Sequence, residues 1–325
     1  MLTRIPLLLV IVLVVASNAE AQTNSNATFR FLNIPSSARA AALGGVNVAL
    51  PEADVTHFQM NPAYLKKKDH NYFGISYLND IAEVNTGFAS GAYHIEHIGT
   101  LGVGVRYVDY GEITSATADG VETGTFQPFD IALNTTMARP FNDNLNYGAS
   151  LSIIHSAYDI YNSTALALSF GAIYTFNERT VAGLVVNNAG TQLSAFNERK
   201  EQLPIDIRIG VSRDLEYLPF RLLLTAHSLN QWVMPVYSDQ EDPEFIDNIL
   251  RRMIIGGELL FSENFHLRLG YNHLLHQELK TGNRIDFAGF SMGVGIQIRR
   301  FHFDIGRSSY SEIGGLTHIS LQTRL

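Results

Sequence analysis

The feature that most constrains the fold is an alternation of apolar and polar residues with a period of two. In segment 145–153 every second residue is apolar, and segments 205–211, 265–271 and 301–305 repeat the pattern. Successive side chains of a strand point to opposite faces, so this alternation predicts strands with one apolar and one polar face.

The alternation predicts fourteen strands, many of them ten or more residues long. They cover residues 71–78, 83–94, 98–110, 124–138, 145–158, 163–176, 179–188, 204–213, 219–229, 251–261, 264–274, 284–298, 300–309 and 315–325. Strands of soluble proteins have about five or six residues, whereas a tilted strand that crosses a bilayer needs about nine to eleven.

The links between these strands are sorted by length. Links after even-numbered strands are short turns, and links after odd-numbered strands are mostly longer. This arrangement is typical of outer-membrane barrels, whose short turns lie in the periplasm, and a soluble sandwich gives no reason for it. We therefore expect an all-β protein, a 14-stranded antiparallel transmembrane outer-membrane β-barrel with a short N-terminal helical plug.

The polar face of the predicted strands carries more charge than a dry core tolerates. Its charged residues include Arg106, Asp206, Arg208, Glu258, Arg268 and Asp304. In a wide barrel such residues face a lumen that is wet or filled by polar contacts.

The N-terminus has the pattern of an export signal. A basic residue precedes the short apolar run 6–15, and Ala19-Glu20-Ala21 matches a small-x-small cleavage site. A retained anchor helix is the alternative. We expect residues 1–21 to be a signal peptide, residues 22–70 a plug or periplasmic segment, and residues 71–325 the transmembrane barrel.

The segment outside the predicted wall contains a short helix pattern, IPSSARAAALGG at residues 34–45. Pro35 with Ser36 or Ser37 is a typical helix start, and the alanine-rich run that follows favours a helix. Gly44 and Gly45 end it, because glycine readily takes the left-handed cap conformation.

The arginine within this helix needs an acidic partner if the helix enters the lumen. We expect Arg39 to pair with an inward carboxylate, and the candidates are Asp206, Glu258 and Asp304. On this interpretation the segment is a plug anchored by Arg39. The alternative is a periplasmic cap over the mouth of the barrel.

This region resembles the PorQ family of outer-membrane barrels. The resemblance is carried by FLNIPSSARAAALGG at residues 31–45, a strand-like stretch at 46–50, and Asn61-Pro62-Ala63. The runs Gly104–Gly111 and Asn187–Gly190 support it. PorV and FadL-type barrels share a looser version of the motif.

The resemblance implies a role in the type IX protein secretion system of Bacteroidota. The protein is then a non-enzymatic barrel in the outer membrane of such a Gram-negative bacterium, surrounded by outer-membrane lipid. It anchors surface components of the attachment complex, with a PorZ-like surface protein, a sortase and PorV-like components as partners. The alternative is a FadL-like outer-membrane channel for hydrophobic small molecules.

The longest predicted extracellular loop, Asn230–Leu250, is the candidate docking loop for such partners. It contains the only tryptophan and an acidic run, and its candidate residues are Trp232, Asp239, Glu241, Asp242 and Glu244. The alternative is a solvated surface loop.

Several function classes find no support in the sequence. The chain has no cysteine, and its net charge of −8 disfavours nucleic-acid binding. The closest approach to a catalytic pair is Ser152 and His155, which point to opposite faces of a strand. We therefore expect no catalytic residues, no cofactor and no metal site.

Overall fold

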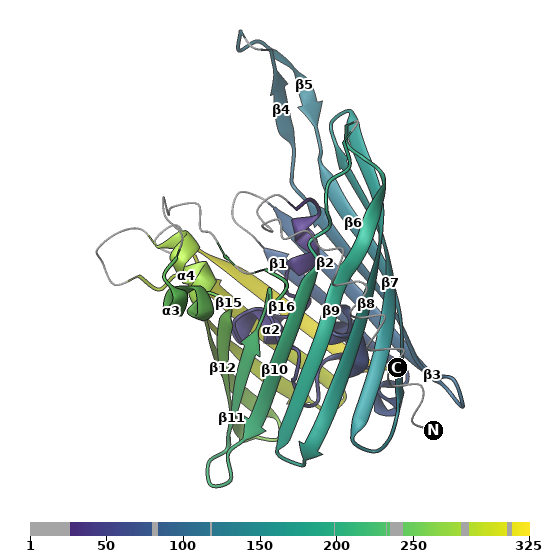
Figure 1. Cartoon of the computed structure of the whole chain (residues 1–325), viewed down its shortest axis with the longest axis vertical. Coiled ribbons are helices and arrows are strands. Elements are labelled where there is room, and N and C mark those ends of the chain that lie inside the picture. Colours follow the sequence, from purple (N-terminus) through teal and green to yellow (C-terminus); the bar gives the residue numbers. More distant parts are fainter. Residues whose placement is uncertain are drawn as a thin grey trace.

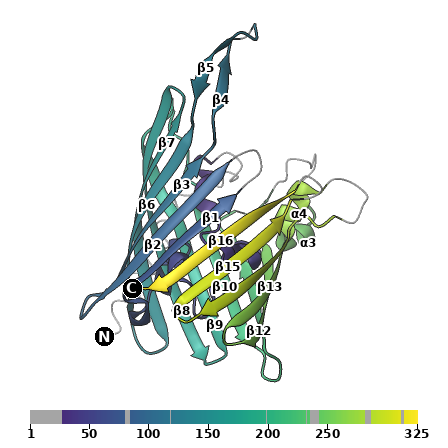
Figure 2. The same cartoon turned by 180° about the vertical axis from the view of Figure 1, so that it is seen from behind.

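The barrel is described by a computed structural model of residues 27–79, 84–117, 119–197, 199–231, 233–234, 243–280, 286–310 and 314–325. Fourteen strands close into an antiparallel barrel, in which the last strand pairs with the first (Figures 1 and 2). The predicted fold class is therefore confirmed. The predicted signal peptide, residues 1–21, lies outside the described residues.

The wall strands follow one another around the barrel in chain order. They are β1 (Tyr72–Asn79), β2 (Asn85–Ile95), β3 (Gly99–Asp109), β6 (Phe129–Pro140), β7 (Leu145–Tyr158), β8 (Tyr161–Asn177), β9 (Thr180–Ser194), β10 (Asp206–Asp214), β11 (Phe220–Ala226), β12 (Met253–Ser262), β13 (Phe265–Asn272), β14 (Phe290–Ile298), β15 (Phe301–Ser309) and β16 (Gly315–Arg324).

Three predicted strand boundaries were wrong by five or six residues. The strand predicted to begin at 124 begins at Phe129, because residues Glu122–Phe126 form a separate strand, β5. This strand pairs with β4 (Ile113–Ala116) in a hairpin that stands above the rim of the barrel (Figure 1). The strand predicted from 284 begins at Phe290, and the strand predicted to end at 188 continues to Ser194.

The two faces of the wall differ in chemistry as the alternation predicted. Outward residues such as Leu133, Leu151 and Ile153 are exposed and apolar, and they form the lipid-facing surface. The six charged residues that the sequence assigned to the lumen are all buried. Within the described residues, no helix has both the length and the apolar character needed to cross a membrane.

The wall is uneven in height. Strand β8 has 17 residues, whereas β11, three strands further round the barrel, has seven. The strands β6 to β9 therefore rise well above the shorter strands on the extracellular side (Figure 1). Two helices, α3 (Phe245–Leu250) and α4 (His273–Leu279), lie on the rim of the low side.

Residues 27–71, here called the inner segment, run through the inside of the barrel. Their short helices are η2 (Arg30–Asn33), α2 (Ala38–Ala42), η3 (Val55–Gln59), η4 (Pro62–Tyr64) and η5 (Lys67–Asp69). In helix α2, Ser37 is the N-cap and its side chain accepts a hydrogen bond from the Ala40 N–H. Gly44 and Gly45 follow the helix with φ of 95° and 103°, the left-handed conformation that ends it.

A set of lumen-facing glycines lets the inner segment touch the backbone of the wall. A Cβ at Gly183 would lie 1.8 Å from the Val48 carbonyl oxygen, and one at Gly171 would lie 1.9 Å from Asn61 Oδ1. The glycine belt consists of Gly148, Gly171, Gly183, Gly270 and Gly306, from five different strands. Any larger residue at these positions would push the inner segment away from the wall.

We predict that Gly183→Ala destabilises the barrel. Because the added methyl group would overlap the Val48 carbonyl, the free energy of unfolding should fall by about 1–3 kcal/mol. Urea unfolding in detergent micelles, followed by heat-modifiable gel migration, measures this. The matched control is Gly87→Ala in β2, where a new Cβ would meet no atom within 4 Å. Equal effects of the two substitutions would contradict the prediction.

Candidate functional site

One buried carboxylate joins the inner segment to the wall. Glu258 on β12 has no exposed side-chain surface, and it accepts hydrogen bonds from three arginines. Arg39 of α2 donates from Nη2 to Oε2 at 2.8 Å and from Nε to Oε1 at 3.1 Å. Arg221 donates to Oε2 at 3.0 Å, and Arg268 donates to Oε1 at 2.7 Å. Such bidentate, charge-assisted contacts are the strong ones in proteins.

The three arginines have further acceptors, so their charges are distributed over several groups. Asp214 accepts from Arg221 Nε at 2.6 Å and from Nη2 at 2.9 Å. Asp304 accepts from Arg268. The Glu52 carbonyl accepts from Arg39 Nη1 at 2.7 Å.

Of the three carboxylates proposed as partners of Arg39, the structure places Glu258 against it. Asp304 contacts Arg268 in the same network. Asp206 lies elsewhere, where it accepts from Arg208 Nε at 2.6 Å and from the Ser228 N–H at 2.7 Å.

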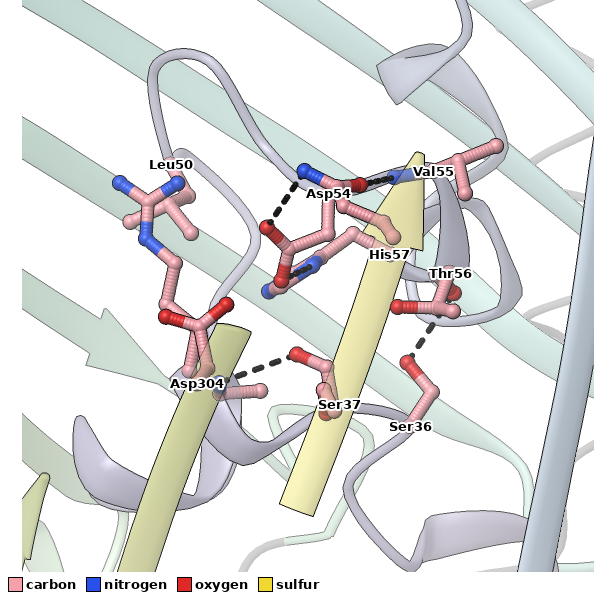
Figure 3. Close-up of polar contacts among 12 residues, drawn as sticks. Ser36, Ser37, Leu50, Asp54, Val55, Thr56, His57 and Asp304 are labelled. Carbon is pink, nitrogen blue, oxygen red and sulfur yellow. Dashed lines mark hydrogen bonds and ion pairs between the residues drawn. The ribbon is translucent and has the colours of Figure 1, made fainter. Parts of the chain in front are cut away.

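The inner segment is also held together by its own polar contacts (Figure 3). Ser36 Oγ donates to the Thr56 carbonyl at 3.0 Å, and His57 Nδ1 lies 3.3 Å from Asp54 Oδ2.

The turn Asn61-Pro62-Ala63 is fixed to both the inner segment and the wall. The Asn61 side chain accepts from the Ala63 N–H at 3.0 Å and donates to the Val48 carbonyl at 3.1 Å. From β7, Asn146 donates to the Ala63 carbonyl at 2.5 Å. These contacts explain why the sequence needs an asparagine followed by proline at the first position of η4.

Beneath the ionic network lies a polar cavity of about 450 Å³. Arg39, Asp54 and Asp304 line it, together with Ser262 and Glu263 near the short turn between β12 and β13. Because short turns lie on the periplasmic side, this end of the lumen is charged and suited to water or polar groups.

The extracellular half of the lumen contains a cluster of buried apolar side chains. Two other apolar clusters lie nearer the periplasmic turns, one around Leu43, Ala63 and Ile173 and one around Phe58, Ala92 and Ala138. The apolar cluster of the extracellular half consists of Phe29, Phe31, Val108, Ala132, Ile154, Ala165, Ala167 and Leu203. Five of these residues lie in the extracellular halves of β3, β6, β7 and β8. Phe29 and Phe31 enter it from the start of the inner segment, held by a 2.7 Å hydrogen bond from Arg106 Nη1 to the Phe31 carbonyl.

Aromatic residues border the apolar cluster near the extracellular rim. Tyr110 donates to Asp130 at 2.6 Å, and Tyr158 donates to the same carboxylate at 2.9 Å. The ring of Phe196 lies 5.4 Å from that of Tyr158 and 5.9 Å from that of Phe29. These contacts connect the β9–β10 link to the first residues of the inner segment.

The sequence analysis missed several residues of this lumen. Arg221 and Asp214 were not singled out, although Arg221 faces Glu258 directly across β11 and β12. Glu258 in turn faces Arg268 across β12 and β13. A search for opposite charges at lumen-facing positions of neighbouring strands could have found this ladder. Phe29 lies outside the motif and Phe31 was quoted only as its first residue, because an isolated apolar residue gives no indication of its partners in the folded barrel.

Four of the five candidate docking residues lie outside the part of the loop that the structure describes. Trp232, Asp239, Glu241 and Asp242 lie outside the described residues, and Glu244 directly precedes α3. Across the part of the chain that the structure describes, no group of three histidine or acidic side chains is arranged to hold a metal ion.

Solved structures show what this fold is similar to. The Ralstonia pickettii toluene transporter TbuX matches with a TM-score of 0.56 and 13% identity, over 91% of this chain and 100% of that one. The CymD monoaromatic hydrocarbon channel gives 0.57 and 14%, over 90% and 98%. A Pseudomonas aeruginosa FadL homologue gives 0.52 and 11%, over 89% and 98%.

These matches establish a shared fold, that of the FadL-type outer-membrane barrels. No family model matches the chain, and no curated protein matches it. The resemblance to the PorQ family continues to rest on its sequence motifs. An outer-membrane location fits the fold.

We predict that Glu258→Ala destabilises the barrel more than Arg39→Ala does. Removing the carboxylate leaves three buried arginines short of an acceptor, and such a loss costs about 3–5 kcal/mol. Removing Arg39 leaves Glu258 with two arginines, so the loss is smaller. Urea unfolding of the single and double variants gives the coupling between the two residues.

The control is Lys67→Ala, which breaks an exposed ion pair with Glu96 and should change the stability little. If Arg39→Ala changed the free energy of unfolding as little as Lys67→Ala does, the helix motif would have no stabilising role.

Proposed function

We propose that the protein is a FadL-like channel that takes up small hydrophobic molecules from outside the cell. One observation carries the proposal: a buried apolar cluster in the extracellular half of the lumen, away from the charged cavity at the periplasmic end. The solved relatives support it, since two of them are a toluene transporter and a monoaromatic hydrocarbon channel.

The apolar cluster already holds two aromatic side chains that a ligand can replace. Burying a phenylalanine side chain is worth about 1.5–3 kcal/mol, and a small aromatic molecule in the same space gains a similar amount. Few hydrogen bonds hold the stretch of chain that contains Phe29 and Phe31 to the rest of the barrel. These include the bond from Arg106 and a 3.2 Å bond from the Thr28 N–H to the Gln202 carbonyl. We propose that the ligand enters as this stretch moves aside.

Binding in the apolar cluster and passage beyond it are separate steps. Below the cluster, the glycine belt holds the inner segment against the wall backbone. The charged cavity lies at the periplasmic end of the lumen, and an apolar molecule enters it at a cost. Passage along the barrel axis therefore requires the inner segment to leave the belt, so uptake and binding are measured independently.

We predict that a disulfide between Thr28→Cys and Gln202→Cys blocks ligand entry. These positions are joined backbone to backbone, and the chain has no other cysteine, so one defined crosslink forms. The measurement is the fluorescence of N-phenylnaphthylamine bound by the purified barrel, and its entry into a Gram-negative host that lacks such a channel. Both signals should fall on oxidation and return on reduction.

The single-cysteine variants are the controls, because oxidation cannot crosslink them internally. The hypothesis that the ligand enters by displacing Phe29 and Phe31 would be wrong if the oxidised double variant bound and admitted the probe as well as the reduced one. Failure of the original chain to bind the probe would reject the channel proposal itself.

A second candidate function is the anchoring of surface proteins of the type IX secretion system in a Bacteroidota-type outer membrane. The motif at residues 31–45 supports it, and so does the hairpin β4–β5, which stands above the rim and exposes Ile113 and Val121 (Figure 1). A PorZ-like protein, a sortase and PorV-like components are its proposed partners. The hairpin and the Asn230–Leu250 loop are the proposed docking elements.

We predict for this second function that the hairpin binds a partner. Replacing residues 113–126 by a short glycine-serine link should leave the barrel folded, since the hairpin pairs only with itself in the described sheet. Affinity purification from the native outer membrane should then lose the surface proteins that the intact chain recovers. Recovery of the barrel alone from both preparations would reject the anchoring function.

A further inference from the structure

The helix α3 on the low rim has its polar and apolar faces reversed relative to a helix of a soluble protein. Its polar residues face the protein: Asp247 accepts from Arg251 Nε at 2.6 Å, and Asn248 Oδ1 accepts from the Met234 N–H at 3.1 Å. Asp247 also lies 2.9 Å from His273 Nε2, which ties α3 to α4. These contacts tie the helix to its own C-cap residue, to Met234 and to the first residue of α4.

The apolar residues of α3 face away from the protein. Phe245 is 72% exposed and Ile246 is 69% exposed, and Ile249 and Leu250 are exposed as well. Residues at these spacings lie on one side of a helix. A compact group of large apolar side chains pointing outward marks a contact surface, either for lipid or for another protein.

The apolar face continues the lipid-facing surface of the barrel without a break in the chain. Helix α3 ends at Leu250, and β12 begins at Met253. The outward residue Ile255 pairs with Tyr271, which pairs in turn with Phe290. The row below contains Leu269 and Met292, which are paired with each other and exposed.

The height of the rim places α3 beside the outer leaflet. The strands β11 to β15 are short, and α3 and α4 lie at their upper ends on the outside of the wall (Figures 1 and 2). The hairpin β4–β5, on the opposite side, stands well above this level. A helix with an apolar outer face at the end of a lipid-facing row has the geometry of an interfacial helix.

We propose that the apolar face of α3, made by Phe245, Ile246, Ile249 and Leu250, is embedded in the outer leaflet of the membrane. Its partner is the region where the acyl chains meet the headgroups. The charged face stays on the protein side, and the contact extends the lipid-facing surface of the low wall upward. This inference does not depend on either proposed function.

The test uses single-tryptophan variants of the full chain. The only native tryptophan is removed by Trp232→Phe, and a new one is introduced by Ile246→Trp. The barrel is reconstituted in phosphatidylcholine vesicles whose acyl chains carry bromine near the headgroup end. Tryptophan fluorescence is quenched by bromine in lipid and by iodide in water. Ile246→Trp should lose most of its fluorescence to brominated lipid and little to iodide.

Two matched variants mark the limits of the assay. Leu269→Trp lies on the outward face of β13 and should respond to brominated lipid only. Val121→Trp lies at the tip of the hairpin, 62% exposed, and should respond to iodide only. Heat-modifiable migration shows that each variant is folded, and Phe245→Trp is a second probe on α3 that replaces one aromatic residue by another.

The outcomes separate lipid from the alternatives. If both α3 probes behaved like Val121→Trp, the face would lie in water and the proposal would be wrong. If both were protected from brominated lipid and from iodide, protein would cover the face, either a second copy of the chain or a surface partner. That result would also reject the proposal.

Discussion

The inner segment is anchored to the wall through one carboxylate that three arginines share. Glu258 is fully out of water, where an unpaired charge would be costly, and Arg39 reaches it from the inner segment to join the wall residues Arg221 and Arg268. The glycine belt makes this possible, because it lets the segment approach the wall closely enough. With the segment in place, a charged cavity lies at the periplasmic end of the lumen and the apolar cluster of Phe29 and Phe31 lies in its extracellular half.

This arrangement reconciles the two readings of the sequence. The close contacts between the inner segment and the wall backbone at the glycine belt suit a protein that presents its outer loops to partners. The apolar cluster in the extracellular half of the lumen suits a protein that binds a hydrophobic molecule. The FadL-type fold supports the second reading more directly, and the motif at residues 31–45 supports the first. The two proposals are compatible, since the proposed ligand site lies inside the tall wall and the proposed docking elements lie at the rim and in the outer loops.

The fold was predictable from the sequence because alternation, strand length and loop length are local properties. The helix α2 was predictable for the same reason, since its cap and its glycines are neighbours in sequence. The partner of Arg39 was not predictable beyond a choice of three, because strand register decides which carboxylates meet the helix. The apolar cluster escaped prediction because Phe29 and Phe31 find their neighbours only after the segment is seated.

The inner segment bonds to the end of the chain, and this has a consequence for assembly. The Ala38 N–H donates to Ser320 Oγ at 2.7 Å, and the Val55 N–H donates to Gln322 Oε1 at 3.0 Å, both on β16. The inner segment therefore contacts β16, the strand that closes the barrel by pairing with β1, from inside the lumen. The contacting residues precede both strands in the chain. Because these hydrogen bonds need β16, the inner segment can take its final position only when the last strand is present. Its docking and the closure of the barrel are therefore one late step of assembly.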